Sequence, residues 1–545
     1  MSTEIDTELA VLLDVGSAWA KASIIGRVRG RWRVVTHVAQ PTSWGSGELR
    51  QALLDRLVRA VDPRLAGRLP ELFAAASRIE SHTARRPGRL AVVAVSRELS
   101  GTALRRAAEA AGWQIIEQVT LDDGRSLADR LATLQALEPD AWLVGGGFDG
   151  GRSPRALEAG ALVASSRRRG TAPVLWAGAD ELASDVVALF EPGAVVAVPN
   201  PRPDGRHEEP AALRDHLQGL LRSVVAREEE THLSAIAIPR AVGAIATSSG
   251  LRALAVDIGA RTAISALAEP NGDVVSRMHG GGGLSGLATV AGMAARVSRL
   301  AGDAGDEATV ADLLQTLRAR PASLPQTAEE LSAVQAAARV QLASLLEDAE
   351  IGPVDLLIGA GSTIASAPHP AQAARILLDG ARPIGVTQLA VDGSALLGPL
   401  GSLPDDEIHE GLALLQEDLL VPLGTSVVCR GGEPGRTAMR VTVHRPGWPP
   451  ITPIELRSGQ LQVVPLGRGQ EAELTIEPGP GVSLGTQRRS PRIQALATGG
   501  AVGLILDARG VPIVLPKRGD DRRAVLAGWR DALGRESATG VERVA

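Results

Sequence analysis

The 545-residue sequence predicts a mixed α/β protein with two similar halves followed by a strand-rich C-terminal region. Two Asp-x-Gly segments, at Asp14 and Asp257, each follow an apolar run and lead into a second one. Between residues 89 and 200, apolar runs alternate with segments of helical periodicity, which is typical of parallel βαβ units. After about residue 424, short alternating runs broken by Gly and Pro favour an all-β module. We therefore expect three domains, at residues 1–250, 251–424 and 425–545.

Composition excludes several classes of protein. A hydrophobic fraction of 44% suffices for several cores, whereas the net charge of −5 and an aromatic fraction of 2% argue against nucleic acid as a partner. Cys429 is the only cysteine, so we expect neither an internal disulfide nor a cysteine zinc site. Residues 1–8 lack the pattern of a signal peptide, and no apolar run is long enough to cross a membrane. We therefore expect a cytoplasmic protein without a membrane span.

The first half begins with three predicted strands and a helix. The strands are expected at residues 9–14, 21–28 and 32–39, and the helix at 47–60. In the βαβ region, strands are expected at residues 90–95, 114–119, 141–144, 173–177 and 194–198, with helices at 101–111, 126–137 and 153–166. Residues 199–210 contain four prolines and are expected to form a loop.

The second half repeats the opening pattern. Strands are expected at residues 254–257, 263–268 and 355–358, a helix at about 284–300, and further helices within 304–350. Near the C-terminus we expect a hairpin, with a buried strand that ends at a turn over residues 507–510 and a second strand at 511–515. An amphipathic helix is expected at 520–533.

The two Asp-x-Gly turns are the strongest candidates for a ligand site. Gly16 and Gly259 allow the backbone to turn tightly and to approach phosphate oxygens, and Asp14 and Asp257 could hold the waters of a Mg²⁺ ion. A third Gly-rich turn, at residues 359–362, follows a predicted strand and suits the approach of a nucleotide to a helix start. Ordinary tight turns that require Gly are the structural alternative.

The order and spacing of these three turns resemble those of the actin, sugar kinase and heat-shock chaperone superfamily. This resemblance implies a two-lobed actin-like (ribonuclease H-like) fold that clamps MgATP or MgADP between two hairpin turns and an adenosine loop. The residues it implies for nucleotide binding are Asp14, Gly16, Ser17, Lys21, Asp257, Gly259, Thr262, Gly359, Gly361 and Ser362.

The middle of the chain resembles one family more closely. Residues 142–151, 174–178 and 198–203, in this order upstream of 255–259, resemble the accessory L protein family of glutamate mutase, and the resemblance covers roughly residues 9–403. It implies a protein partner, an adenosylcobalamin-dependent mutase that this protein would assist or reactivate as a chaperone does.

The sequence departs from that family at both turns. Ala18 and Ala20 replace threonines of the first turn, and Ala263 and Ile264 replace a threonine and an aspartate of the second. Alanine cannot donate to a phosphate oxygen, and Ile264 cannot hold a metal-bound water. We therefore expect weak nucleotide binding without efficient hydrolysis. Lys21 could contact a phosphate, or could lie as an exposed lysine over a neighbouring tryptophan.

Two other functions stay open from the sequence. An active MgATP-dependent ATPase or kinase would use Asp14 and Asp257 around the metal, and a non-catalytic actin-like scaffold would serve a pilus, secretion or division assembly. The C-terminal region could dock a partner or mediate self-assembly, so a homo-oligomer also stays open. Weaker candidates for ligand contacts are Asp149 and the Gly run after His279, for which a turn cap and a hinge are the alternatives, while Asp405 is expected to start a helix.

Overall fold

The computed structural model describes residues 5–28, 31–42, 49–60, 77–84, 86–168, 172–225, 232–280, 283–302, 305–347, 349, 351–414, 418–447, 452–485 and 492–534. The chain divides into two compact units, one made of residues 83–236 with 275–280 and the other of the remaining residues. The βαβ region thus forms a compact unit of its own.

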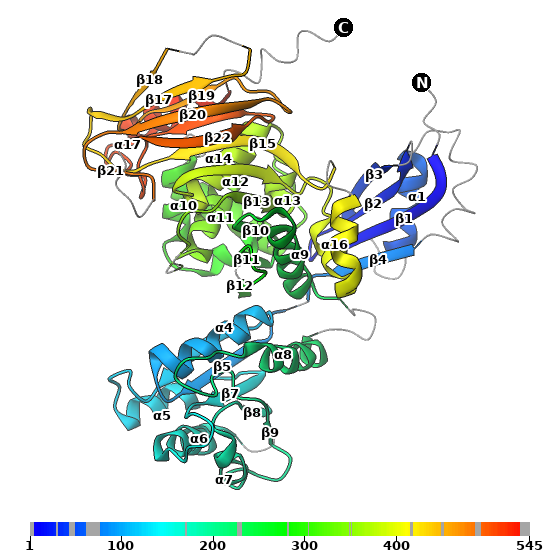
Figure 1. Ribbon diagram of the computed structural model, residues 1–545, viewed down its shortest axis with the longest axis vertical. Helices are drawn as coiled ribbons and strands as arrows, with labels where there is room; N and C mark the ends of the chain where they lie inside the picture. The colour runs from blue at the N-terminus through cyan, green and yellow to red at the C-terminus, as the bar shows by residue number, and fades with distance from the viewer. Residues whose placement is uncertain are drawn as a thin grey trace. The chain divides into compact units, whose positions relative to one another are not determined.

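The first sheet of the larger unit contains four strands in the order β3-β2-β1-β4 (Figure 1). Its elements are β1(Ile5–Val15), β2(Trp19–Val28), β3(Arg31–Pro41), α1(Leu49–Ala60) and β4(Ser77–His82). Strands β1, β2 and β3 form an antiparallel meander, and β4 pairs parallel to β1. Alternate residues of β1 and β2, such as Val11, Ala20 and Ile24, are buried against Leu53 and Leu57 of α1, as a sheet with one covered face requires. Residues 47 and 48 of the predicted helix lie outside the described residues.

The second sheet repeats this arrangement and then extends it. The elements that follow the inserted unit are α9(Ser234–Ser249), β10(Ala253–Ile258), β11(Thr262–Ala268), β12(Val274–Gly280), η3(Leu284–Thr289), α10(Met293–Ala301), α11(Glu307–Ala319), α12(Ala328–Leu345), β13(Leu356–Ala360), α13(Ser362–Ala365), α14(Pro370–Ala381), β14(Gly385–Val391), α15(Leu397–Gly401) and α16(Asp405–Leu414). The strand order β12-β11-β10-β13 matches β3-β2-β1-β4, with the fourth strand again parallel to the first. This duplicated order confirms the predicted two-lobed actin-like fold.

The predicted helix at 284–300 is wrong in one respect. Residues Leu284–Thr289 form a 3₁₀ helix, and α10 begins only at Met293. Gly292 separates the two segments with a left-handed backbone at φ 74°. A right-handed helix cannot continue through that conformation.

The C-terminal region is strand-rich, as predicted, and part of it continues the second sheet. Its elements are β15(Val421–Val428), β16(Arg430–Gly431), β17(Thr437–His444), β18(Ile454–Arg457), β19(Leu461–Val464), β20(Glu471–Pro478), β21(Val482–Ser483), β22(Ile493–Thr498), β23(Gly503–Asp507) and α17(Gly519–Gly534). Strands β15, β23 and β19 follow β14 in one eight-stranded sheet, while β18, β17, β20 and β22 form a separate sheet. A shared core between these two sheets buries Val441, Leu474 and Leu506.

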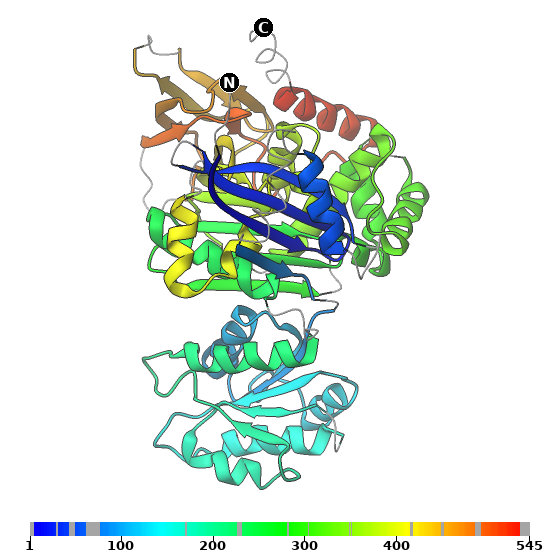
Figure 2. The ribbon, with the colours of Figure 1, turned by 90° about the vertical axis from the view of Figure 1, so that its right-hand side faces the viewer.

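The predicted hairpin at 507–515 is wrong. Strand β23 already pairs with β15 on one side and with β19 on the other, so neither edge is free for a following strand. Helix α17 forms as predicted and packs on the second lobe through the buried side chains of Leu526, Trp529 and Leu533 (Figure 2).

A buried ionic cluster joins the C-terminal region to the second lobe. Arg509 donates to Asp379 of α14 at 2.6 Å and to Asp507 of β23 at 2.7 Å, and Arg339 of α12 donates to Asp379 at 3.0 Å. The guanidinium of Arg509 also lies 5.0 Å from the ring centroid of Trp529. The arginines hold the pKa of the Asp379 carboxyl well below its usual range despite burial. Removing one partner of such a cluster is costly, so these contacts fix the C-terminal region against the lobe.

The smaller unit contains a five-stranded parallel sheet in the order β6-β5-β7-β8-β9. Its elements are β5(Arg89–Ala94), η1(Arg97–Gly101), α4(Thr102–Ala110), β6(Gln114–Thr120), α5(Leu127–Gln135), β7(Ala141–Gly145), α6(Pro154–Ser166), β8(Val174–Trp176), η2(Asp180–Leu182), α7(Ala183–Val187), β9(Val195–Ala197) and α8(Pro210–Val225). Helices lie on both faces of the sheet (Figure 1). The parallel βαβ arrangement of residues 89–200 is therefore confirmed. In the described part of the chain, no helix has the length and apolar character needed to cross a bilayer.

Candidate functional site

The two Asp-x-Gly turns have the same backbone geometry. The N–H of Gly16 donates to the carbonyl of Trp19 at 3.0 Å, and the N–H of Gly259 donates to the carbonyl of Thr262 at 3.0 Å. A Cβ atom at Gly16 would lie 2.6 Å from the Trp19 oxygen, so only glycine fits there. The repeated sequence pattern thus forms the same turn at the end of β1 and of β10.

The strand register explains why the two turns differ in charge. Asp14 lies directly opposite Lys21, and Asp257 lies directly opposite Ile264. Residues paired in this way share one face of the sheet. The Lys21 Nζ therefore lies 3.1 Å from the Asp14 Oδ2, whereas Asp257 faces a buried isoleucine. Of the two aspartates, only Asp14 therefore has a positively charged residue directly opposite it.

Lys21 is surrounded by acidic groups from both lobes. Burial lowers the pKa of Lys21, but the nearby carboxylates of Asp14, Asp257 and Asp392 outweigh burial and raise the pKa above its usual value. Burial raises the pKa of Asp257 to about 6, with further increases from Asp14 and Asp392 and a decrease from Lys21. Burial likewise raises the pKa of Asp392 to about 6. The ammonium group of Lys21 is thus the positive charge that interacts with the carboxylates of Asp14, Asp257 and Asp392.

Asp392 was not predicted as a site residue. It follows β14, and its two carboxylate oxygens accept from the N–H groups of Leu396 and Leu397 at 2.8 and 3.0 Å. The available signal was its place at the end of a strand in the sheet of β10 and β13. The sequence did not show that these three strands are neighbours, so the position of Asp392 beside the two turns was not evident.

The third predicted turn lies against the second. Gly361 has φ 87°, and a Cβ atom there would lie 2.5 Å from the Asp257 Oδ1 and 2.4 Å from the Ile258 oxygen. Gly359 is similarly crowded, because a Cβ atom there would lie 2.7 Å from the Ile364 side chain. The structure therefore brings the turn at 359–362 against Asp257.

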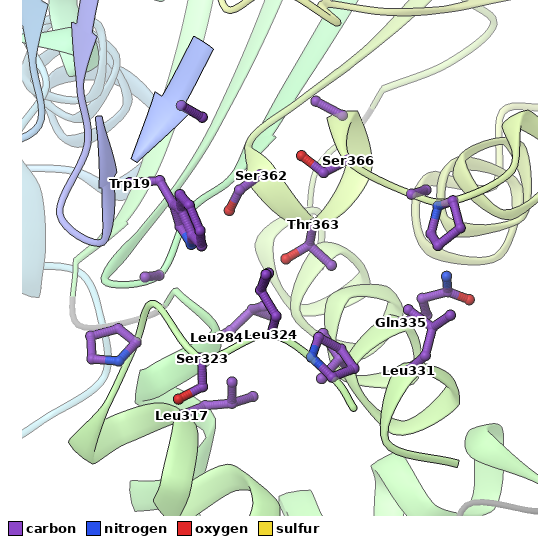
Figure 3. A pocket seen from close by; sticks show the side chains of 18 of the residues that line it. Trp19, Leu284, Leu317, Ser323, Leu324, Leu331, Gln335, Ser362, Thr363 and Ser366 are labelled. Atoms are coloured by element: carbon purple, nitrogen blue, oxygen red, sulfur yellow. The ribbon is translucent and has the colours of Figure 1, made fainter. Parts of the chain in front are cut away.

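A cavity of about 360 Å³ opens beside these turns (Figure 3). Of the predicted residues, Lys21 and Ser362 line it; the other eight build the surrounding turns, with Ser17 half-buried and Thr262 buried. Trp19 projects into the cavity across from Ser362 and Thr363, and Leu331 and Gln335 of α12 line it as well (Figure 3). Lys21 therefore lies in a cavity and not on an exposed strand face.

Sequence reasoning also missed Gln335. Its Nε2 atom is buried and has no hydrogen-bond partner among the described residues. Burying an unpaired amide donor is costly, so the position suits a ligand acceptor. Helical periodicity alone cannot separate such a residue from a core position of α12.

Most of the weaker candidates have structural roles. The Asp149 Oδ1 accepts from the Asn200 side chain at 3.0 Å and from the Asp180 N–H at 3.3 Å, so Asp149 joins the loops after β7, β8 and β9. Asp405 lies in the first turn of α16, as predicted, and accepts from Arg240 at 2.6 Å. Of the Gly run after His279, residues 281 and 282 lie outside the described residues.

Comparisons with solved structures give distant likenesses. The (R)-2-hydroxyglutaryl-CoA dehydratase component A of Acidaminococcus fermentans is 10% identical, with 72% of this chain and 96% of that chain covered and a TM-score of 0.27. A carbohydrate kinase from Novosphingobium aromaticivorans is 14% identical, with 78% and 94% covered and a TM-score of 0.26. The ethanolamine utilization protein EutJ of Carboxydothermus hydrogenoformans is 11% identical, with 72% and 88% covered and a TM-score of 0.24. Because these TM-scores are low, we base the fold assignment on the duplicated strand order and not on these structures.

A family model gives the decisive match. No curated protein matches the chain. The model described as MutL protein matches residues 10–419, which include both lobes and the inserted unit. This range agrees with the predicted resemblance to the glutamate mutase L proteins over residues 9–403. The chain therefore belongs to the MutL protein family.

Proposed function

We propose that this protein is an actin-like accessory protein that binds a nucleotide in the cavity beside the two turns and hydrolyses it slowly or not at all. The observation that carries the proposal is the position of Lys21, which lines the cavity and lies among Asp14, Asp257 and Asp392. A lysine held in this way suits a phosphate group, while Ser362 and Gln335 line the same cavity.

The acidic surroundings of Lys21 imply that the phosphates need a cation. Three carboxylates against one ammonium would repel a di- or triphosphate, and Mg²⁺ supplies the missing positive charge when bound. Among the described residues, no group of three or more His, Cys, Asp or Glu side chains is arranged to hold a metal. Asp14 and Asp257 would therefore hold Mg²⁺ through its waters, together with the phosphates.

The second turn accounts for the low hydrolysis that we propose. Ile264 is 4% exposed and faces Asp257, so the second turn offers a hydrocarbon where the family pattern has a carboxylate. Ala263 likewise lacks the hydroxyl of the family pattern. Each lost charge-assisted contact costs about 1.5–3 kcal/mol, or roughly ten- to a hundredfold in affinity or rate.

Family membership supports the choice of partner. The glutamate mutase L proteins are associated with adenosylcobalamin-dependent mutases, and we propose that this protein assists or reactivates such an enzyme. A two-lobed fold with a nucleotide between its lobes can change shape with the bound nucleotide, which is a means of acting on a partner without chemistry on a small substrate.

Calorimetric titration with MgADP and MgATP tests the nucleotide site. We expect weak binding to the native protein, binding weakened about ten- to a hundredfold by Lys21→Met, and no change in the control Lys517→Met, which removes an exposed lysine of the C-terminal region. A phosphate-release assay completes the test. Rapid release that Asp257→Ala abolishes would establish an active ATPase or kinase and contradict the proposal.

A reactivation assay tests the role toward the mutase. A mutase inactivated by turnover is incubated with this protein, nucleotide and fresh adenosylcobalamin, and we expect activity to return with the native protein and Lys517→Met but not with Lys21→Met. Filament formation without nucleotide dependence, together with no reactivation, would instead support a scaffold.

A further inference from the structure

A second cavity, of about 690 Å³, lies where the second lobe meets the C-terminal region. Its walls come from α10, the ends of α12 and α14, the loop before β13, and residues of the C-terminal region. It shares no lining residue with the cavity beside the turns, so it is a separate candidate site.

Three arginines from distant parts of the sequence line this cavity. They are Arg296 of α10, Arg382 after α14 and Arg430 of β16. None of them forms an ion pair with a residue that the structure describes: Arg296 contacts the Met293 sulfur at 3.9 Å, and the Arg382 Nε donates to the Asp379 carbonyl at 3.3 Å. Glu347 is the one carboxylate among the described lining residues. The described lining residues thus carry a net positive charge in a chain whose net charge is −5.

The backbone at Arg382 has a conformation that is costly for a residue other than glycine. Arg382 ends α14 in a left-handed conformation, with φ 52°. Glycine is the usual residue at such a position, because other residues pay a steric cost there. The Arg382 Nε donates to the Asp379 carbonyl at the end of α14, whereas its two Nη groups have no partner among the described residues and are available to an anion.

The loop at 351–353, which also lines the cavity, is held in place by another arginine. Arg252 donates through Nη1 to the Pro353 carbonyl at 2.6 Å and through Nε to Glu269 at 2.7 Å. Its backbone N–H also donates to Asp355 at 2.8 Å. These contacts fix the segment 351–353, so the cavity is bounded by a rigid loop.

We propose that this cavity binds a small polyanion that carries at least two phosphate or carboxylate groups. Guanidinium groups bind such groups through paired, charge-assisted hydrogen bonds, and three of them around one hollow suit more than one anionic group. The volume lies in the range of small-molecule sites, about 300–1,000 Å³. The proposal does not depend on nucleotide binding in the first cavity.

Titration of the full-length protein with inorganic pyrophosphate and with the tricarboxylate citrate, at low ionic strength, tests the proposal. We expect at least one of the two to bind, and the tighter one identifies phosphate or carboxylate as the natural group. Arg430→Gln and Arg382→Gly should each weaken this binding about ten- to a hundredfold. The control Arg59→Gln, an exposed arginine of α1, and Lys21→Met in the first cavity should leave it unchanged.

Thermal melting distinguishes loss of a ligand contact from loss of structure. Because glycine relieves the left-handed backbone and so offsets the lost hydrogen bond to the Asp379 carbonyl, Arg382→Gly should melt close to the native temperature while it loses pyrophosphate or citrate binding. The proposal is overturned if neither anion binds, if binding survives both arginine substitutions, or if Lys21→Met abolishes it, since the anion would then occupy the first cavity.

Discussion

Replacing Asp257 by Asn should stabilise the protein at neutral pH. Burial raises the pKa of Asp257 from 3.8 to about 6, and Ile264 opposite it provides no counter-charge. Because the folded state holds the proton more tightly than the unfolded state, ionisation of this carboxyl opposes folding. At 1.36 kcal/mol per pKa unit, the full penalty is about 3 kcal/mol. Asn has nearly the same size and carries no charge, so it removes the penalty.

Because the pKa of Asp257 is raised in the folded state, the stability gained by Asp257→Asn should increase with pH. Below about pH 3 the carboxyl is mostly protonated in both states, so the gain from Asp257→Asn should be less than about 0.5 kcal/mol. The penalty develops as pH rises from about 4 to about 6, and above pH 7 the gain should approach about 3 kcal/mol.

Scanning calorimetry of the native protein and Asp257→Asn at pH 4.5 and 7.5 measures this difference. The transition of the larger compact unit should rise by a few degrees at pH 7.5 and by much less at pH 4.5. Asp531→Asn, at an exposed carboxylate of α17, controls for the change in net charge. Equal melting temperatures at pH 7.5, or an equal gain at both pH values, would refute the electrostatic reasoning.

Three further substitutions test other parts of the structure. Gln335→Leu removes a buried donor that lacks a partner among the described residues, so the free protein should melt at or above the native temperature. Calorimetric titration should show that MgADP binding is weakened about tenfold. Unchanged binding would exclude Gln335 from the site. Asp379→Asn removes the carboxylate that three guanidinium groups share, those of Arg339, Arg375 and Arg509, and should cost about 3–5 kcal/mol in calorimetric unfolding. The exposed Asp520→Asn should change little, and similar costs for the two variants would contradict the role of the cluster. Ile264→Asp places a carboxylate opposite Asp257, so the melting temperature without Mg²⁺ should fall. With Mg²⁺, the rate of phosphate release from ATP should rise at least tenfold. An unchanged rate would show that position 264 does not limit hydrolysis.

Local sequence patterns were sufficient to predict those elements that depend on residues close together in the sequence. The turns at Asp14 and Asp257 were identified because a strand, an Asp and a Gly two residues later form a hairpin through contacts within a few residues. The same reasoning located the parallel strands of residues 89–200 and helix α17. It failed at Gly292, where one left-handed residue interrupts a periodic apolar pattern.

The predicted strand at 511–515 failed for a different reason. The apolar pattern of this segment suits a strand, but a strand forms only where a neighbour has a free edge. Strand β23 is paired on both sides, so its edges are already occupied by β15 and β19.

The sequence by itself determined the duplicated turns, the loss of the second-turn aspartate at Ile264 and the family, because each of these is written in contiguous residues. Only the tertiary structure decided that Asp392 joins Lys21 and that Gln335 lines the same cavity. It also brought Arg296, Arg382 and Arg430 around a second cavity. These groups come from strands and helices far apart in the chain, and their proximity follows from sheet order and packing, which no local pattern specifies.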